Sequence, residues 1–139
     1  MPIPIQLWDT AGQERFQSLG TSFYRGADAC VLVFDLCNGT SFENLGIWKS
    51  EFLLQTESSF RSESPFVLVG TKCDREADRD VSRDEVLSWC EQNKIPAENY
   101  FEVSAKTNAN VEEVFDAVLR TAMRLTYRQN LYVYNSFNE

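Results

Sequence analysis

Histidine is absent from the 139 residues of this chain. Its absence excludes pairs of serine or cysteine with histidine as nucleophile and base, and it excludes most zinc sites. The chain has 4 cysteines, but none of them forms a Cys-x-x-Cys pair, so we expect reduced, buried thiols. These absences remove several nucleophilic and zinc-dependent enzyme classes in one step.

Basic residues and long apolar runs are also scarce. The chain has 13 lysines and arginines against 21 acidic residues, which gives a net charge of −8. Nucleic acid is therefore not an expected partner. No apolar run approaches the ~20 residues that a membrane-spanning helix needs. No basic and then apolar leader precedes Pro2. We therefore expect a cytoplasmic protein.

Glycine is sparse as well, with 6 residues, and none of them is followed by lysine. The phosphate-binding motif G-x-x-x-x-G-K-[ST] is therefore absent from this sequence. This absence matters because the opening segment 8–14 (WDTAGQE) reads like the middle of a nucleotide-binding site. A turn that contacts phosphate normally needs an upstream segment to hold that phosphate.

The hydrophobic pattern predicts an α/β fold. Continuous apolar runs at 29–34 and 66–69 are typical of strands buried on both faces of a parallel sheet. Residues 3–8 alternate like an edge strand, and residues 100–103 fit a further short strand. Pro2 and Pro4 favour an edge position for the first of these, because proline lacks the N–H that a ladder needs.

Three helical patterns accompany these strands. Thr40 and Ser82 each open a capping-box sequence, and Asn110 precedes the clearest amphipathic pattern, which ends near Leu125. Strands that alternate with helices indicate βαβ units. We expect one domain over residues 1–127 and an irregular tail over 128–139.

Ligands of parallel α/β sheets bind beyond the carboxyl ends of the strands. Three short segments of this chain follow predicted strands there: 9–12 (DTAG), 71–74 (TKCD) and 104–106 (SAK). A carboxylate such as Asp74 can accept from the ring N–H and the amino group of guanine, a donor pair that adenine lacks. The stem of Lys72 can lie over the base, and the backbone N–H of Ala105 can donate to the guanine carbonyl.

The first segment fits the phosphate end of the same nucleotide. Asp9 is placed to hold Mg²⁺ through water, since magnesium prefers oxygen ligands and keeps several waters. The backbone N–H of Gly12 can approach the terminal phosphate, because glycine has no side chain to obstruct it. Gln13 can orient an attacking water. Asp35, at the end of the 29–34 run, is expected to cap a helix or turn.

These motifs, with the segments IQLW, RFQSL, FYRGA and LVFD, resemble those of the Rab family of Ras-like small GTPases. The runs RFQSLGTSFYRGADACVLVFD and PFVLVGTKCD are most similar to its late-endosomal and vacuolar branch, Rab seven. The resemblance covers residues 5–125. It implies a P-loop NTPase-like, Ras-type G domain with a doubly wound, mostly parallel sheet, truncated at the N-terminus so that the first strand and the phosphate-binding loop are missing.

The resemblance also assigns roles to the candidate residues. The second switch would contain Asp9 as the metal ligand, Gly12, and Gln13 as the catalytic residue. The remaining nucleotide-binding residues would be those of the base-recognition motif and of the last base-contacting loop: Thr71, Lys72, Asp74, Ser104, Ala105 and Lys106. Most Rabs have asparagine in place of Thr71. Trp8 and Tyr24 would display the nucleotide state to effectors, and a plain core role for both stays open.

The implied function is that of a GTP-binding switch in endosomal and vacuolar vesicle trafficking. GTP or GDP and Mg²⁺ would be its cofactors, and effectors, exchange factors and GTPase-activating proteins its partners. Without the phosphate loop, we expect this chain neither to bind GTP tightly nor to hydrolyse it. The alternatives are an interaction module that binds partners regardless of nucleotide, and a reading frame that begins too late.

Two further expectations follow from the same resemblance. Rabs usually end in prenylated cysteines, but the last cysteine here is Cys90, so the chain shows no direct membrane anchor. Peripheral attachment to late endosomes or vacuoles would belong to a full-length prenylated form, and we expect a monomer. The missing strand would lie between residues 3–8 and 29–34, so the chain alone should be unstable, or those two strands should pair directly, or they should expose apolar edges and aggregate.

Overall fold

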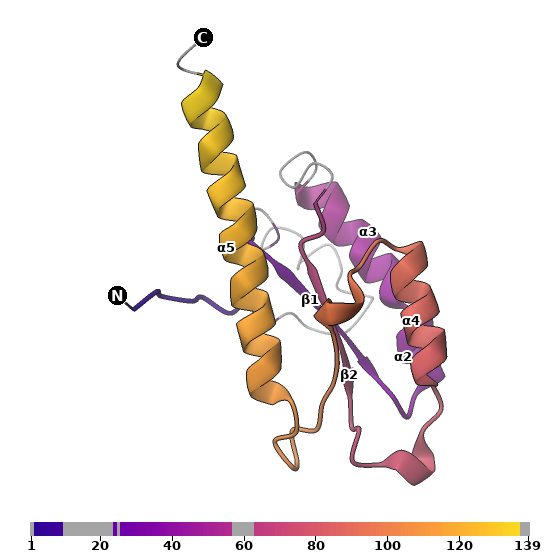
Figure 1. The fold of residues 1–139 in the computed structure, drawn as a ribbon. Helices are drawn as coiled ribbons and strands as arrows, with labels where there is room; N and C mark the ends of the chain where they lie inside the picture. Colours follow the sequence, from indigo (N-terminus) through magenta and orange to yellow (C-terminus); the bar gives the residue numbers. More distant parts are fainter. Residues whose placement is uncertain (1, 10–23, 25, 57–62, 137–139) are drawn as a thin grey trace.

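The computed structural model describes residues 2–9, 24, 26–56 and 63–136, with the backbone alone for 127–136. The described strands are β1 (Cys30–Asp35), β2 (Phe66–Thr71) and β3 (Tyr100–Glu102). They form a 3-stranded parallel sheet in the order β1-β2-β3 (Figure 1). All three coincide closely with the predicted apolar runs, and the predicted α/β class is confirmed.

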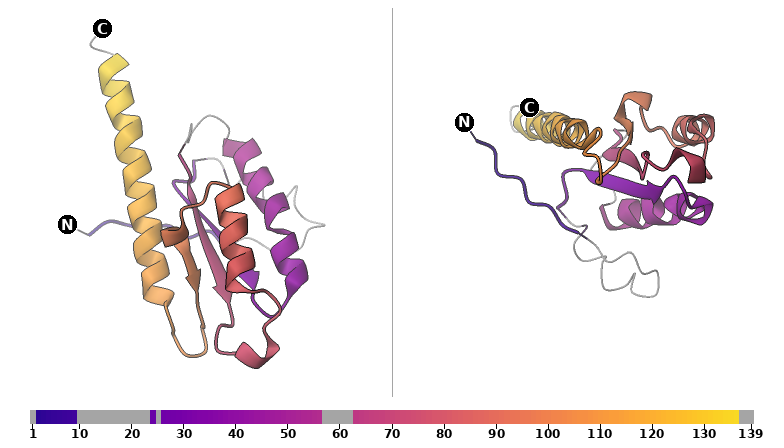
Figure 2. Two further views of the ribbon diagram at one scale, coloured as in Figure 1. Left: turned by 45° about the vertical axis from the view of Figure 1, so that its right-hand side comes forward. Right: turned by 90° about the horizontal axis from the view of Figure 1, so that it is seen from below.

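Helices cover both faces of this sheet. They are α2 (Gly39–Glu43), α3 (Leu45–Thr56), α4 (Arg83–Gln92) and α5 (Val111–Ser136), with short 3₁₀ helices η4 (Glu76–Asp78) and η5 (Ala97–Asn99). Figures 1 and 2 show α5 on one side of the sheet and α3 and α4 on the other. The strands therefore need apolar side chains on both faces, which is why they read as continuous apolar runs.

The core is divided by the sheet into two clusters. On one face, Phe34 and Leu68 pack with Phe52 of α3 and Val86 of α4. On the other face, apolar side chains of the strands pack with those of α5, among them Val67, Val69, Val103, Val114 and Ala117. Successive residues of a strand point to opposite faces, so β2 supplies both clusters. The 4 cysteines are free thiols; Cys90 is buried as expected, whereas Cys30, Cys37 and Cys73 are only partly buried.

The expectation of a strand at residues 3–8 is wrong. Residues 2–9 form no strand, and Ile3, Ile5, Leu7 and Trp8 are more than half exposed. This segment runs past α5 away from the body of the domain (Figure 1). Alternation of apolar residues describes the two faces of a strand but supplies no hydrogen-bonding partner, and Pro2 and Pro4 remove two donors.

The expected direct pairing of this segment with the 29–34 strand is also absent within the described residues. There, β1 pairs with β2 alone. Val33 of β1 is 54% exposed. An open parallel edge next to an exposed valine is the outcome anticipated for unpaired strands.

The start of the first predicted helical region differs from the prediction. Asn38, and not Thr40, is the N-cap: its side-chain oxygen accepts from the backbone N–H groups of Thr40 and Ser41. The region then divides into two helices, α2 and α3, on either side of Asn44. Asparagine is as good an N-cap as serine or threonine, and here the Asn38 side chain satisfies the first free N–H groups of the helix in place of Thr40.

The start of α4 agrees with the prediction, whereas the structure of the chain end differs from it. Ser82 and Glu85 form a complete capping box at α4. At the other end, the prediction of an irregular tail is wrong, because α5 continues to Ser136. The boundary between a domain over 1–127 and a tail over 128–139 stays a prediction.

Candidate functional site

The loops after β2 and β3 lie side by side at the carboxyl edge of the sheet. The backbone N–H of Val103 donates to the carbonyl of Gly70 at 2.8 Å, and that of Cys73 donates to the carbonyl of Val103 at 3.0 Å. The parallel ladder thus continues one step beyond the strands. These two hydrogen bonds fix the position of the 71–74 segment relative to the 104–106 segment along the strand direction. The two segments therefore lie next to each other, as predicted from their places at the ends of neighbouring strands.

A side-chain hydrogen bond joins these two loops. The hydroxyl of Ser104, which is fully buried, donates to Oδ1 of Asp74 at 2.7 Å. The same hydroxyl oxygen accepts from the backbone N–H of Thr107 at 3.2 Å. Ser104 therefore orients the Asp74 carboxylate and at the same time closes the turn of its own loop.

The Asp74 carboxylate is held in its charged form. The hydrogen bond from Ser104 is the main reason that the pKa of Asp74 lies below its ordinary value; burial opposes it, and a backbone hydrogen bond and the charges of Lys106 and Arg75 lower the pKa further. An ionised carboxylate has about four acceptor positions. The bond to Ser104 thus leaves room for the two N–H donors on one edge of guanine.

Thr71 and Lys72 turn toward the opposite neighbour, β1. The Thr71 hydroxyl donates to the carbonyl of Phe34 at 3.1 Å, which ties the end of β2 to the end of β1. The ammonium of Lys72 lies 2.7 Å from Oδ2 of Asp35. Lys72 has a φ of 64°, the left-handed conformation that few non-glycine residues adopt. The loop therefore sends Lys72 toward β1 and Asp74 toward β3.

Ala105 and Lys106 occupy the exposed tip of the loop after β3. The base of this loop is closed where the backbone N–H of Ser104 donates to the carbonyl of Ala109 at 3.2 Å. The Asn110 side chain donates to the carbonyl of Glu102 at 2.8 Å. A loop closed at its base in this way presents the Ala105 backbone next to Asp74 without depending on the exposed side chains.

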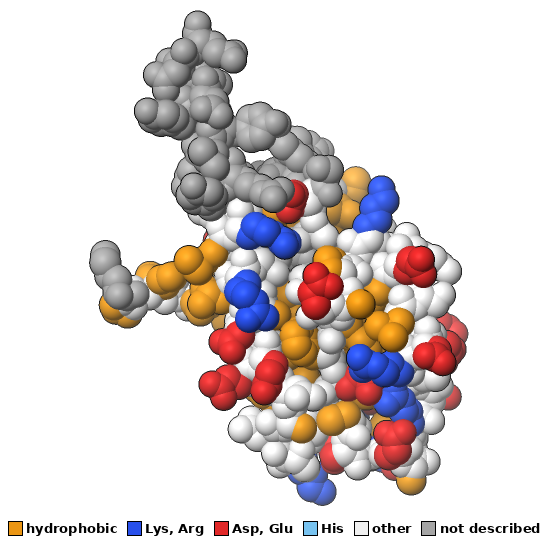
Figure 3. All heavy atoms as spheres, viewed as in Figure 1, with side chains coloured by type: hydrophobic (Ala, Val, Ile, Leu, Met, Phe, Trp, Pro, Cys, Tyr) orange, Lys and Arg blue, Asp and Glu red, His pale blue; other side chains and the backbone are white. Residues whose placement is uncertain are grey.

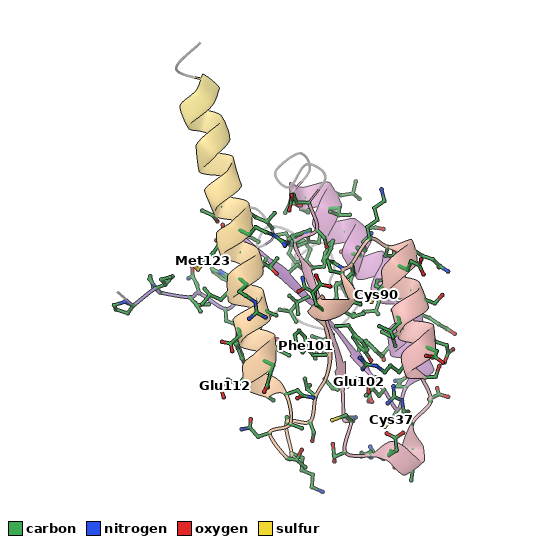
Figure 4. All side chains as sticks on the ribbon, viewed as in Figure 1. Cys37, Cys90, Phe101, Glu102, Glu112 and Met123 are labelled. Carbon is green, nitrogen blue, oxygen red and sulfur yellow. The ribbon has the colours of Figure 1, made fainter. Side chains whose placement is uncertain are left out.

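A charged network behind the loops was missed from the sequence. The Arg79 guanidinium binds both carboxylate oxygens of Glu102, at 2.6 and 2.9 Å, and the Tyr100 hydroxyl donates to the same carboxylate. Figure 4 shows Phe101 on the α5 side of the sheet and Glu102 on the other. Glu102 lies at the end of β3 and Arg79 follows the 71–74 segment, so the pair links the same two loops from behind. In the sequence, the only sign of this network was the alternation of side chains along the short predicted strand that contains Glu102.

The predicted phosphate side is described only in part. Asp9 is exposed, while Gly12 and Gln13 lie outside the described residues. Within the described chain, no hydrogen bond or ion pair joins Asp9 to the base loops, and no cluster of three or more potential metal-ligating side chains occurs. In Figures 1 and 2 segment 2–9 leaves the body beside α5, away from the loops at the lower end of the molecule.

The two aromatic residues assigned to an effector surface differ in their surroundings. Tyr24 packs against Phe52 of α3, with ring centroids 5.7 Å apart, and belongs to the edge of the core. Trp8 is 56% exposed on segment 2–9, whose apolar side chains project at the left of Figure 3. The core role left open is therefore supported for Tyr24. Each helix in the described part of the chain is too short or too polar to cross a membrane.

Comparison with known proteins identifies relatives of the whole described domain. The Ras family model matches residues 1–124. The chain is 48% identical over 132 residues to the Ras-related protein RABG3f of Arabidopsis thaliana, covering 93% of this chain and 63% of that protein. It is 51% identical over 123 residues to the Ypt/Rab-type GTPase ypt7 of Schizosaccharomyces pombe, covering 87% and 58%.

A third relative gives the same result. The Ras-related protein Rab-7a of Dictyostelium discoideum is 49% identical over 124 residues, covering 88% of this chain and 60% of that protein. The chain thus spans about three fifths of the length of the curated relatives that it matches. The match to the family model and these identities agree with the sheet, the helices and the paired loops described above. This chain belongs to the Ras family of small GTPases and is Rab7-like within it.

Proposed function

We propose that this chain provides the guanine-binding half of a Rab-type GTP/GDP switch that acts in endosomal and vacuolar vesicle trafficking. The observation that carries the proposal is the hydrogen bond from Ser104 to Asp74, which joins the two predicted base-contacting loops. The names of the relatives, Rab7 and Ypt/Rab-type GTPase, support the switch and the trafficking role.

The proposed pocket uses five of the described candidate residues. Asp74 accepts from the ring N–H and amino group of guanine, and Ala105 donates its backbone N–H to the carbonyl oxygen. Lys72 lies over the face of the base, and Thr71 and Ser104 hold the two loops in register. Adenine would leave the Asp74 oxygens without donors, so the pocket discriminates by the cost of an unpaired charged acceptor.

The phosphate end of the proposal rests on Asp9, Gly12 and Gln13. We propose Asp9 as the carboxylate that would hold Mg²⁺, which takes most of its ligands from water and phosphate; segment 2–9 would then have to lie closer to the base loops than it does in this structure. The ion would neutralise phosphate charge. Because the 139 residues contain no G-x-x-x-x-G-K-[ST] motif, we propose that this chain alone binds GTP weakly and does not hydrolyse it efficiently.

Titration of the purified 139-residue chain with guanosine, adenosine, GDP and ATP tests the base pocket. Guanosine lacks phosphates, so it isolates the base loops from any missing phosphate contacts. We expect guanosine to shift the amide resonances of residues 71–74 and 104–106 in NMR spectra, and ATP to leave them unchanged. Equal shifts with adenosine and guanosine would refute the pocket. Turnover of GTP by this chain at the rate of an intact small GTPase would refute the proposed inactivity.

A nucleotide-independent interaction module is the second candidate. The exposed apolar side chains of segment 2–9, which include Ile3, Ile5 and Leu7, favour it because such side chains are common at binding surfaces. Partners of Rab proteins, such as effectors, exchange factors and GTPase-activating proteins, would then bind equally with and without GDP. A pull-down with a defined Rab effector at saturating GDP and without nucleotide separates the two candidates.

A further inference from the structure

We propose that Asp35 is a positioning residue for the guanine base, because it holds the Lys72 side chain in the orientation in which its stem supports the face of the base. This inference rests on the proposed function and deepens it. Asp35 was expected only to cap a turn. It does so, accepting from the backbone N–H of Cys37 at 2.8 Å, but its second oxygen lies 2.7 Å from the Lys72 ammonium.

The carboxylate that holds Lys72 is itself fixed. The backbone N–H of Asp35 donates to the Ser41 hydroxyl at 2.9 Å, and that hydroxyl donates to the carbonyl of Asn38 at 2.7 Å. The Asp35 side chain is only 22% exposed, and Oδ1 is occupied by the Cys37 N–H. Oδ2 is therefore presented in one direction, toward the loop that follows β2.

Asp35 is charged at neutral pH. Burial alone would raise its pKa, but the hydrogen bonds from Lys72 and from the Cys37 backbone, with the charges of Lys72 and Arg75, outweigh burial and lower it. The partner, Lys72, has a flexible four-carbon stem and is 49% exposed. A fixed anion at the end of a flexible stem restricts the stem before any ligand arrives, and this restriction lowers the entropic cost of binding.

The position of the pair makes this restriction specific to the base. Asp35 ends β1, whereas the partner of Asp74, Ser104, follows β3 on the other side of β2. The lysine is thus drawn to one side of the loop and the base-reading carboxylate to the other. The left-handed backbone at Lys72, with φ at 64°, accompanies this divergence. Asp74 can then meet the edge of a base while Lys72 supports its face.

The pair differs from the other exposed ion pair of the same loop. Arg75 and Asp78 lie three residues apart, and their side chains are 51% and 59% exposed. The distance from a guanidinium nitrogen of Arg75 to Oδ2 of Asp78 is 3.0 Å. A pair of this kind usually contributes little, because solvent screens it and both side chains lose freedom. Asp78→Asn removes the same charge near the same loop without touching Lys72, so it is a matched control for Asp35→Asn.

The experiment compares these two variants in the 139-residue chain with guanosine as the probe, followed by NMR. Asp35→Asn keeps an oxygen for the Cys37 N–H but loses the ion pair. We expect its dissociation constant for guanosine to rise about fivefold, with Asp78→Asn within about 1.5-fold of the parent. Thermal unfolding of both variants should match the parent, which separates positioning from a loss of structure.

A double-substitution cycle tests whether Asp35 acts through Lys72. In a Lys72→Met background the Asp35→Asn change should have no further effect on guanosine affinity, because the interaction it removes is already absent. Equal affinity of the parent and Asp35→Asn, or additive effects in the cycle, would overturn the inference while leaving the proposed function intact. Failure of the parent to bind guanosine at all would overturn both, so the two failures are distinguishable.

Discussion

The hydroxyl of Ser104 lies 2.7 Å from Oδ1 of Asp74, 30 residues away in the sequence, and donates a hydrogen bond to it. This bond crosses from the loop after β3 to the loop after β2. It makes the orientation of the carboxylate depend on a buried residue of a different loop. Consequently, changes at Ser104 should alter Asp74 without any direct change to the carboxylate.

Ser104→Ala is expected to raise the pKa of Asp74 toward the ordinary aspartate value, because the largest cause of its lowered pKa is removed. Titration of the Asp74 side-chain carbon signal by NMR measures this. Guanosine affinity should fall as well, since the carboxylate becomes free to rotate. Ser88→Ala, at an exposed position of α4, is the control and should leave the Asp74 titration unchanged. An unchanged pKa in Ser104→Ala would contradict the role of this bond.

Glu102→Gln is expected to destabilise the domain by about 3 kcal/mol at neutral pH, because the largely buried Arg79 loses the short bonds to the Glu102 carboxylate and keeps only the Glu76 carboxylate, 3.7 Å away, as an anionic partner. Urea unfolding measures the difference. Asp78→Asn, which breaks the exposed pair with Arg75, should change stability by less than about 0.5 kcal/mol.

The effect of Glu102→Gln should also depend on pH. Burial raises the pKa of Glu102, but the hydrogen bonds from Arg79 and Tyr100 and the nearby guanidinium charges outweigh it, so the pKa is lowered. The stability that the ionised Glu102 carboxylate contributes to the domain is therefore complete above the unfolded glutamate pKa of about 4.3. It is lost as the pH falls through the lower pKa of Glu102 in the folded state. The parent and the variant should converge in stability in acid. A constant difference down to the lowest pH would contradict this account.

Gly70→Ala is expected to destabilise the sheet by about 1–3 kcal/mol through overpacking. A Cβ at Gly70 would lie 3.0 Å from Cδ2 of Leu36 and from Cζ of Phe34, both buried in the core. Gly46→Ala is the matched control: a Cβ there has nothing within 4 Å, and alanine in α3 should stabilise by about 0.5–1 kcal/mol. Thermal unfolding of both variants measures the two changes in stability, which should have opposite signs. Changes of the same sign would contradict the packing described for β2.

Ser82→Ala is expected to cost about 1 kcal/mol, because the first turn of α4 loses its capping box. The Ser82 hydroxyl accepts from the Glu85 backbone N–H at 3.2 Å, and the Glu85 carboxylate accepts from the Ser82 backbone N–H at 2.9 Å. Ser82→Thr retains the hydroxyl and should recover most of the stability in urea unfolding. Loss of stability in both variants alike would point to a cause other than the cap.

The elements whose signals are local could be predicted from the amino-acid sequence. Apolar runs predicted the three strands, and Ser82 and Asn110 marked the starts of α4 and α5. Because the carboxyl ends of parallel strands share an edge, the same reasoning predicted that the segments around Asp9, Asp74 and Ser104 would meet; those around Asp74 and Ser104 do, and Asp9 lies on a segment that forms no strand and runs away from them. Periodicity, capping and strand direction are properties of short stretches of chain, and they can be read without the rest of the fold.

The tertiary structure alone decided which distant groups became partners. Asp35 pairs with Lys72 and Arg79 with Glu102 because β-strand register and loop path bring them together, and neither pair has a sequence spacing that predicts it. Residues 3–8 have the alternation of a strand but remain exposed, because a strand exists only when another backbone supplies its hydrogen bonds. Local patterns set what each segment can form, and long-range pairing sets which of these possibilities is realised.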